Sequence, residues 1–141
     1  MLVRDIMQKN VVTAKPDATV KEAAAVMNHS HIGSLVVLDK EKIVGILTER
    51  NILVSIADGH DPELTTAEDI MAKKVITVAP DETVDKAVGL MAEYKIKKLP
   101  VVEGGKLVGI ITASDIVVVE LKLIESVANL LSIKLPGYRG G

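Results

Sequence analysis

The pattern of hydrophobic residues predicts two amphipathic helices of the same design. In residues 20–27, apolar side chains repeat at i, i+3, i+4 and i+7, and residues 84–91 repeat this spacing. Such spacing gives each segment one apolar face along a helix. A threonine precedes each segment, so we expect the helices to begin just after Thr19 and Thr83. Thr19 and Glu22 also have the spacing of a capping box.

Extended segments flank these two helices. Residues 11–14 and 75–78 are short runs rich in β-branched side chains, and a proline soon follows each. Four longer β-rich runs come after the helices, at 34–39, 42–48, 98–103 and 106–112. The Gly-Gly pair at 104–105 is typical of a two-residue hairpin turn. A further helix is expected to begin just after Thr48 and just after Thr112.

The two sets of elements are copies of one unit. The motif DIM at 5–7 recurs at 69–71, and an offset of 64 residues then holds without a gap. Of 49 aligned pairs, 21 are identical. One unit is too small to bury a good core alone. We therefore predict an α+β fold in which two β-α-β-β-α repeats pack about a pseudo-two-fold axis. The expected segments are a first repeat (1–58), a linker (59–65), a second repeat (66–124) and a C-terminal helix extension with a tail (125–141).

The last helix is expected to outrun the repeat and to reach about Lys134. Its apolar face consists of Ile116, Val119, Leu123, Val127, Leu130 and Leu131. The first half has no counterpart to the extension, so this face either covers the core of the monomer or forms a dimer surface. We favour the dimer surface. Residues 135–141 are expected to be mobile.

Composition and charge narrow the function classes. The chain has 141 residues, 48% of them hydrophobic, and a formal net charge of −2. No overall positive field therefore favours nucleic acid or an anionic membrane. Its only aromatic residues are two tyrosines, which argues against single-stranded nucleic acid. No apolar run is long enough to span a membrane, and the N-terminal residues do not resemble a secretory signal. We expect a cytoplasmic protein.

No catalytic or metal-binding group of residues can be assembled from the sequence. The chain has no cysteine and three histidines. His29 and His31 are two residues apart at a helix end, which places them on different faces without a third metal ligand. No nucleophile and base stand at a workable spacing. We therefore expect neither a metal site nor an enzyme.

The phrase TASD at 112–115 allows two interpretations. Thr112 and Asp115 suit a helix N-cap and first turn, where they satisfy unpaired N–H groups. The same N–H groups, with the hydroxyls of Thr112 and Ser114, are also suited to a phosphate. Asp115 would then accept hydrogen bonds from the two hydroxyls of a ribose. The first half has TERN instead, which puts Asn51 where Asp115 stands.

Two glycines and one basic loop carry further hypotheses. Gly45 and Gly109 lie inside strand patterns, where a ligand, another backbone or a crossing helix comes close. The loop YKIKK at 94–98 is basic, while the first half has SHIGS at the equivalent place. It is either a solvated loop or a source of cations for a ligand.

In combination, these features resemble a CBS-domain pair, the Bateman module, from about Leu2 to about Leu123. The resemblance rests on DIM, TVAPDETVDKA, IKKLPVV and GIITASD. It implies a regulatory module that binds AMP, ADP or ATP between the repeats, with AMP preferred and no cofactor required. It also implies a homodimer and a regulated partner protein. The alternatives are a sensor of S-adenosylmethionine and a ligand-free dimerisation or scaffold module.

The resemblance also assigns roles to residues. Asp115 matches the ribose-binding aspartate of the family, and Thr112 and Ser114 match its phosphate-binding hydroxyls. The matching positions for the base, the wedge beside it and the cations are Met7, Asn10 and Val12, then Ile32, Gly33 and Ser34, then Lys97 and Lys98. By pseudo-symmetry, a second cleft would use Thr48, Arg50, Asn51, Met71, Lys74, Ile76, Ile96 and Lys97. This cleft departs from the family pattern at Arg50 and Asn51.

Overall fold

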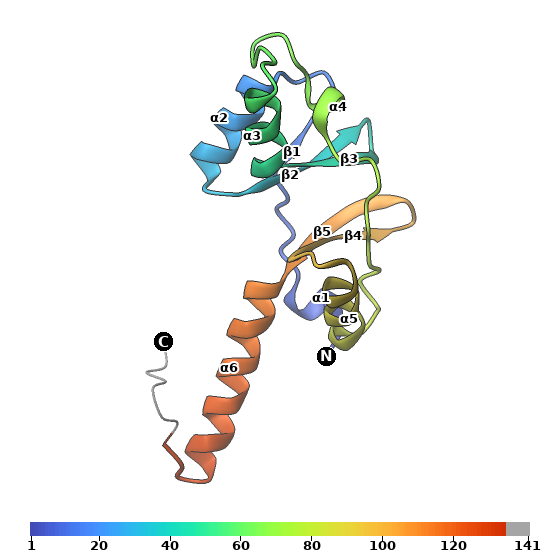
Figure 1. The fold of residues 1–141 in the computed structure, drawn as a ribbon. Coiled ribbons are helices and arrows are strands. Elements are labelled where there is room, and N and C mark those ends of the chain that lie inside the picture. The colour runs from blue at the N-terminus through green and yellow to red at the C-terminus, as the bar shows by residue number, and fades with distance from the viewer. Residues whose placement is uncertain (135–141) are drawn as a thin grey trace.

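The computed structural model describes residues 1–134 (Figure 1). In chain order its elements are α1 (Val3–Ile6), β1 (Thr13–Ala14), α2 (Val20–Ser30), β2 (Ser34–Asp39), β3 (Lys42–Thr48), α3 (Glu49–Ala57), α4 (Ala67–Ile70), α5 (Val84–Tyr94), β4 (Lys98–Glu103), β5 (Lys106–Thr112) and α6 (Ala113–Leu130). The predicted tail at 135–141 lies outside the described residues. The α+β fold with two equivalent halves is confirmed.

Each half has its own sheet and its own core. The first half packs α2, α3 and α4 against a sheet of order β1-β2-β3, and the second packs α1, α5 and α6 against the pair β4-β5 (Figure 1). The predicted helix starts are confirmed, because Thr19, Thr48, Thr83 and Thr112 are all N-caps. The capping box of Thr19 and Glu22 forms as predicted.

The two four-residue helices cross over to the opposite half. Helix α1 begins the chain, yet Val3 is fully buried in the core of the second half with Val84 and Leu99. Helix α4 follows the linker, yet Ala67 is fully buried in the core of the first half. Neither helix is predicted from the sequence. The exchange ties the halves together at two places, the start of the chain and the segment just after the linker.

The predicted first strand of each repeat is shorter than expected. In the first half only Thr13 and Ala14 form a strand, parallel to β2. In the second half no strand forms over 75–78, and a single parallel bridge joins Val78 to Val101. Pro100 stands where β2 has Val36. Because proline has no N–H, it cannot donate the next hydrogen bond of the ladder.

The glycines inside the strands are places where another backbone crosses, as one of the hypotheses held. A Cβ built on Gly109 would lie 2.9 Å from Gln8 O, and one built on Gly45 would lie 2.9 Å from Ala72 O. Both distances are shorter than real Cβ contacts allow. The segments after α1 and α4 therefore need glycine beneath them. The 104–105 turn is also confirmed, since both glycines have positive φ.

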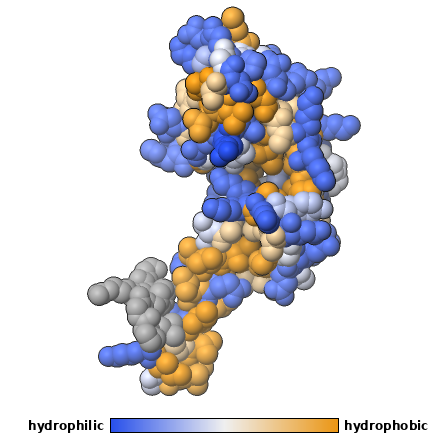
Figure 2. Space-filling view, viewed as in Figure 1, coloured by the Kyte–Doolittle hydropathy of each residue, from blue (hydrophilic) through white to orange (hydrophobic). Residues whose placement is uncertain are grey.

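Helix α6 leaves the body of the protein (Figure 1). Ile116 and Val119 pack on the core of the second half, but Leu123 is 47% exposed and Leu130 is 83% exposed. The extension therefore does not cover the core, and Figure 2 shows its hydrophobic surface. The helix ends at Leu130, short of Lys134, because Ser132 takes a left-handed conformation and Ile133 N donates back to Ala128 O.

Candidate functional site

Two equivalent helix starts lie between the halves, where β3 runs into α3 and β5 runs into α6. Thr48 Oγ1 accepts from Asn51 N at 3.2 Å, and Thr112 Oγ1 accepts from Asp115 N at 3.1 Å. The first N–H of α6 donates to Lys97 O at 2.8 Å, and that of α3 donates to Gly33 O at 3.0 Å. These bonds fasten the 32–34 and 96–98 loops beside the helix starts. They also remove one N–H at each start from those available to a phosphate.

The fourth residue of each phrase behaves differently in the two halves. Asn51 Oδ1 accepts from Thr48 N and from Thr48 Oγ1, both at 2.9 Å, which closes a capping box. Asp115 Oδ2 instead accepts from Gln8 Nε2 at 2.8 Å. The side-chain oxygen of Asn51 is thus occupied by donors of Thr48, at the start of the same helix. The carboxylate of Asp115 faces the segment that crosses from the other end of the chain.

A cavity of about 450 Å³ lies between the two sheets. Four pairs of its lining residues are related by the offset of 64: Gly33 and Lys97, Ser34 and Lys98, Val36 and Pro100, Ile46 and Ile110. Its other lining residues are Thr48, Ala72, Lys74, Ile76, Lys95 and Ile96. The cavity therefore lies on the pseudo-two-fold axis and extends toward the side of the predicted second cleft.

The lining of this cavity is apolar with a strong positive charge. Four lysines contribute to it and no carboxylate does. Among the described residues, none of Lys74, Lys95, Lys97 and Lys98 forms an ion pair. Lys74 Nζ lies 5.6 Å from the centre of the Tyr94 ring. The equivalent first-half positions hold Asn10, His31, Gly33 and Ser34. The four equivalent positions of the first half carry no lysine, so the four lysines are specific to the second half, and their charge suits an anionic ligand.

The structure brings eight of the predicted site residues together in this cavity. They are Gly33, Ser34, Thr48, Lys74, Ile76, Ile96, Lys97 and Lys98. Of the others, Asn10, Val12, Arg50 and Ser114 are exposed. Met7 and Met71 pack beneath the crossing segments, against the cores of the second and first halves. Thr112, Asp115 and Asn51 stand at the helix starts, outside the cavity lining.

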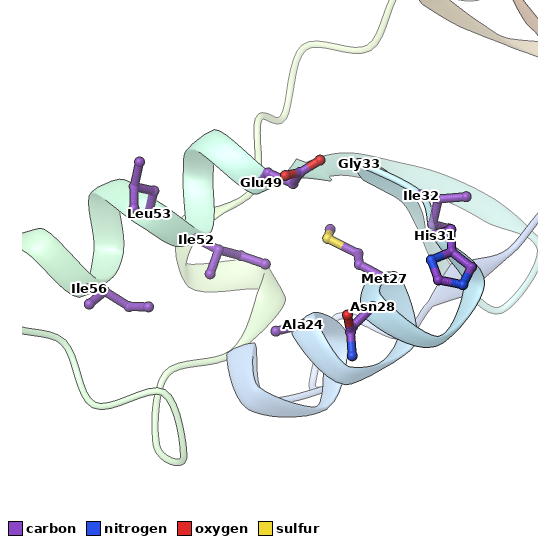
Figure 3. Close-up of a pocket in the computed structure, with 10 residues that line it drawn as sticks. All are labelled: Ala24, Met27, Asn28, His31, Ile32, Gly33, Glu49, Ile52, Leu53 and Ile56. Atoms are coloured by element: carbon purple, nitrogen blue, oxygen red, sulfur yellow. The ribbon is translucent and has the colours of Figure 1, made fainter.

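A second hollow lies on the outer face of the first half. It is a groove of about 470 Å³ between α2 and α3, where Met27 and Ala24 face Ile52 (Figure 3). Ile32, Gly33 and Glu49 line the end nearest the cavity. Leu53 and Ile56 are more than half exposed beside it. This groove is mostly apolar, with Asn28, His31 and Glu49 as its polar lining residues, and it has no lysine, unlike the cavity between the sheets.

Gln8 is not among the predicted site residues, and neither are six residues of the cavity lining: Val36, Ile46, Ala72, Lys95, Pro100 and Ile110. The partner of Gln8, Asp115, is 107 residues away, and nothing in the local pattern indicates that the two meet. The one available signal is the exception to the repeat, since Gln8 aligns with Ala72 while the residues before it are identical. Among described residues, no group of three or more histidines, aspartates or glutamates is placed to hold a metal ion. No helix within 1–134 is long and apolar enough to cross a membrane.

The chain is similar to known proteins over most of its length. The family model of the CBS domain matches residues 3–58 and 67–122. Protein MK0525 of Methanopyrus kandleri is 38% identical over 128 residues, which cover 89% of this chain and 65% of that protein. The inosine-5′-monophosphate dehydrogenase of Korarchaeum cryptofilum is 39% identical over 109 residues, 77% of this chain and 22% of the enzyme. The chain thus spans less than two thirds of the length of both relatives.

A solved structure adds information on ligands. The CBS domain pair of protein MJ0100, in complex with 5′-methylthioadenosine and S-adenosyl-L-methionine, superposes with a TM-score of 0.78. It is 34% identical to this chain, and the match covers 87% of this chain and 98% of that one. Both ligands named for that structure contain adenosine.

Proposed function

The chain belongs to the CBS-domain family, whose model matches both of its repeats, and on this basis we propose that it is a regulatory module that binds an adenosine nucleotide. The observation that carries the choice of a nucleotide is the cavity between the sheets, with its four lysines and no carboxylate. Phosphate groups complement such a lining. Isoleucines and Pro100 supply the apolar surface against which a base can lie.

AMP is the preferred ligand of this proposal, with ADP and ATP next. Asp115 offers a carboxylate to the two ribose hydroxyls, as the resemblance to the family implies, and Thr112 and Ser114 stand beside it with hydroxyl groups. Lys97 and Lys98 lie beside the start of α6, on the loop and strand of the same half. Longer phosphate chains would extend toward Lys74 and Lys95.

S-adenosylmethionine is the second candidate, because the MJ0100 pair was solved with it. It shares the adenosine of AMP, but it carries a sulfonium cation in place of the phosphate. Four lysines without a carboxylate repel a cation. We therefore place S-adenosylmethionine after the nucleotides for this chain.

A homodimer is also part of the proposal. The exposed apolar side chains of α6 include Leu121, Leu123, Ile124, Val127 and Leu130. They lie on a helix that projects from the body (Figures 1 and 2). Burying each such side chain against a second copy would contribute about 1.5–3 kcal/mol at most. A second α6 offers a matching apolar surface.

A thermal-shift screen with AMP, ADP, ATP and S-adenosylmethionine tests the choice of ligand, with GMP as the control for the base. A ligand at 100 times its Kd adds about 2.7 kcal/mol of stability, which raises Tm by roughly 5–10 °C in a protein of this size. We expect AMP to give the largest shift. Absence of any shift with all four adenosine ligands would favour the ligand-free scaffold, and equal shifts with AMP and GMP would contradict recognition of the base.

A further inference from the structure

Asp115 departs from a local pattern that four of the other five described helices share, the exception among those five being α5, which has Lys86 at this position. In α1, α2, α3 and α4 the third helical residue is Asp5, Glu22, Asn51 and Asp69, and its side chain accepts from the backbone N–H of the N-cap residue. Asp115 holds the same position in α6, but its carboxylate makes no such bond within the described residues. It accepts from Gln8 Nε2 instead. A carboxylate held away from its local partner needs another partner to keep it there.

The backbone fixes Gln8 for this contact. Gln8 N donates to Ile110 O at 2.8 Å, and Ile110 N donates to Gln8 O at 2.9 Å. Gly109 allows the close crossing, because a Cβ there would meet Gln8 O. The position of Gln8 is therefore set by strand β5, the strand that leads into α6. Only the side-chain torsions of Gln8 remain to be ordered when its amide donates to Asp115.

The other half of the molecule provides the comparison without this amide. Ala72 makes the same two backbone bonds with Ile46, both at 2.9 Å, so its backbone is placed as that of Gln8 is. Its side chain has no donor. Asn51, which takes the place of Asp115, closes its capping box with Thr48. The two halves thus differ in both members of the pair.

We propose that Gln8 is a positioning residue that holds the Asp115 carboxylate out of the capping box and beside the crossing segment, where the carboxylate receives the ribose diol of the nucleotide. This inference rests on the proposed function. Gln8 occupies one acceptor position on Oδ2, and a carboxylate has about four. Enough acceptor capacity remains for two hydroxyls. Because Asp115 does not close the capping box, α6 lacks the local stabilisation that this bond would provide. In return, the carboxylate is held in one direction by Gln8.

The test compares AMP with 2′-deoxy-AMP by titration calorimetry in wild type and in Gln8→Ala. In the wild type, AMP is expected to bind about 10-fold more tightly than the deoxy nucleotide, because the diol supplies one more charge-assisted bond. In Gln8→Ala, the carboxylate is free to close its capping box, and this ratio is expected to fall to about 2-fold or less. Tm of the free protein is expected to stay the same or rise slightly, which separates positioning from damage to the fold.

A gain-of-function variant gives the second arm. In an Asp115→Ala background, Asn51→Asp together with Ala72→Gln rebuilds the pair on the other side and is expected to restore the preference for AMP. Asn51→Asp without Ala72→Gln is the matched control, and it is expected to restore little of that preference.

The outcomes separate the inference from the proposed function. If wild-type protein binds AMP with a diol preference that Gln8→Ala keeps in full, the positioning role of Gln8 is wrong and the proposed function stands. If wild-type protein binds no adenosine nucleotide at millimolar concentration, the proposed function is wrong and the inference fails with it.

Discussion

Val3 N donates a hydrogen bond to Glu82 O at 2.8 Å, which fastens the start of the chain to the second half of the molecule. The same bond recurs in the first half, where Ala67 N donates to Ala18 O at 2.8 Å. Both members of these pairs are related by the offset of 64 residues. Each half is therefore completed by a short helix that the chain supplies from beyond its own repeat.

This exchange predicts which fragments can fold. A fragment of residues 1–64 contains the first repeat but lacks α4, which buries Ala67 and covers Leu47. A fragment of residues 10–72 contains α4 and omits α1, which packs elsewhere. We expect circular dichroism to show more helix and a higher melting temperature for 10–72 than for 1–64, although both are less stable than the whole chain, because only 10–72 closes the core of the first half. Equal stability of the two fragments would contradict the exchange.

Gly109→Ala is expected to destabilise the protein by about 1–3 kcal/mol. The added Cβ would lie 2.9 Å from Gln8 O, which accepts from Ile110 N, while Gln8 N donates back to Ile110 O. The control is Gly89→Ala in α5, where nothing lies within 4 Å of the added Cβ. That substitution is expected to stabilise by about 0.5–1 kcal/mol through helix propensity. Urea unfolding measures both, and opposite signs are the expected result.

The exposed apolar surface of α6 predicts how the proposed homodimer responds to introduced charge. Leu123→Glu with Leu130→Glu places two carboxylates on the exposed apolar face, so static light scattering is expected to report a monomer, while circular dichroism is expected to show unchanged helix content. Ser126→Glu with Asn129→Glu on the polar face is the control and is expected to leave the dimer intact. A folded, unchanged dimer in the first variant would move the interface to another surface, such as the α2–α3 groove.

Acid is expected to weaken the cap of α4. Hydrogen bonds from the backbone and side chain of Thr66 hold the pKa of Asp69 below its ordinary value of 3.8, with a smaller contribution from His60. A lowered folded pKa contributes stability that is complete above 3.8 and is lost as pH falls through the lowered value. Asp69→Asn should therefore be less stable than wild type at pH 6, and the difference should shrink at pH 3. Asp81→Asn, whose carboxylate makes no hydrogen bond within residues 1–134, serves as the control in urea unfolding.

The repeat and its periodicity predicted most of the fold because they are carried by long segments. Helices α2 and α5 have eleven residues each, and their apolar faces are evident in the sequence. Helices α1 and α4 have four residues each, fewer than a periodic signal requires. Their exchange between halves depends on tertiary packing that no local pattern expresses. The absence of a strand at 75–78 could have been predicted, because Pro100 stands on the strand with which it would pair.

The candidate site was predicted less completely. The resemblance selected eight residues that line the cavity, including Lys74 and Lys97. The Gln8–Asp115 bond joins residues at opposite ends of the chain, so only the folded structure reveals it. Lys95 also lines the cavity. From the sequence, its loop could equally have been a solvated basic loop without a ligand.

The account depends most on the difference between Asp115 and Asn51, which is tested by calorimetric titration of AMP into wild type, Asp115→Ala and Asn51→Ala. A charged carboxylate that receives the ribose hydroxyls should make the Asp115 side about 10- to 100-fold tighter than the Asn51 side. We predict that Asp115→Ala abolishes the tight phase and that Asn51→Ala leaves it nearly unchanged. Loss of the tight phase in Asn51→Ala, with its retention in Asp115→Ala, would contradict the account.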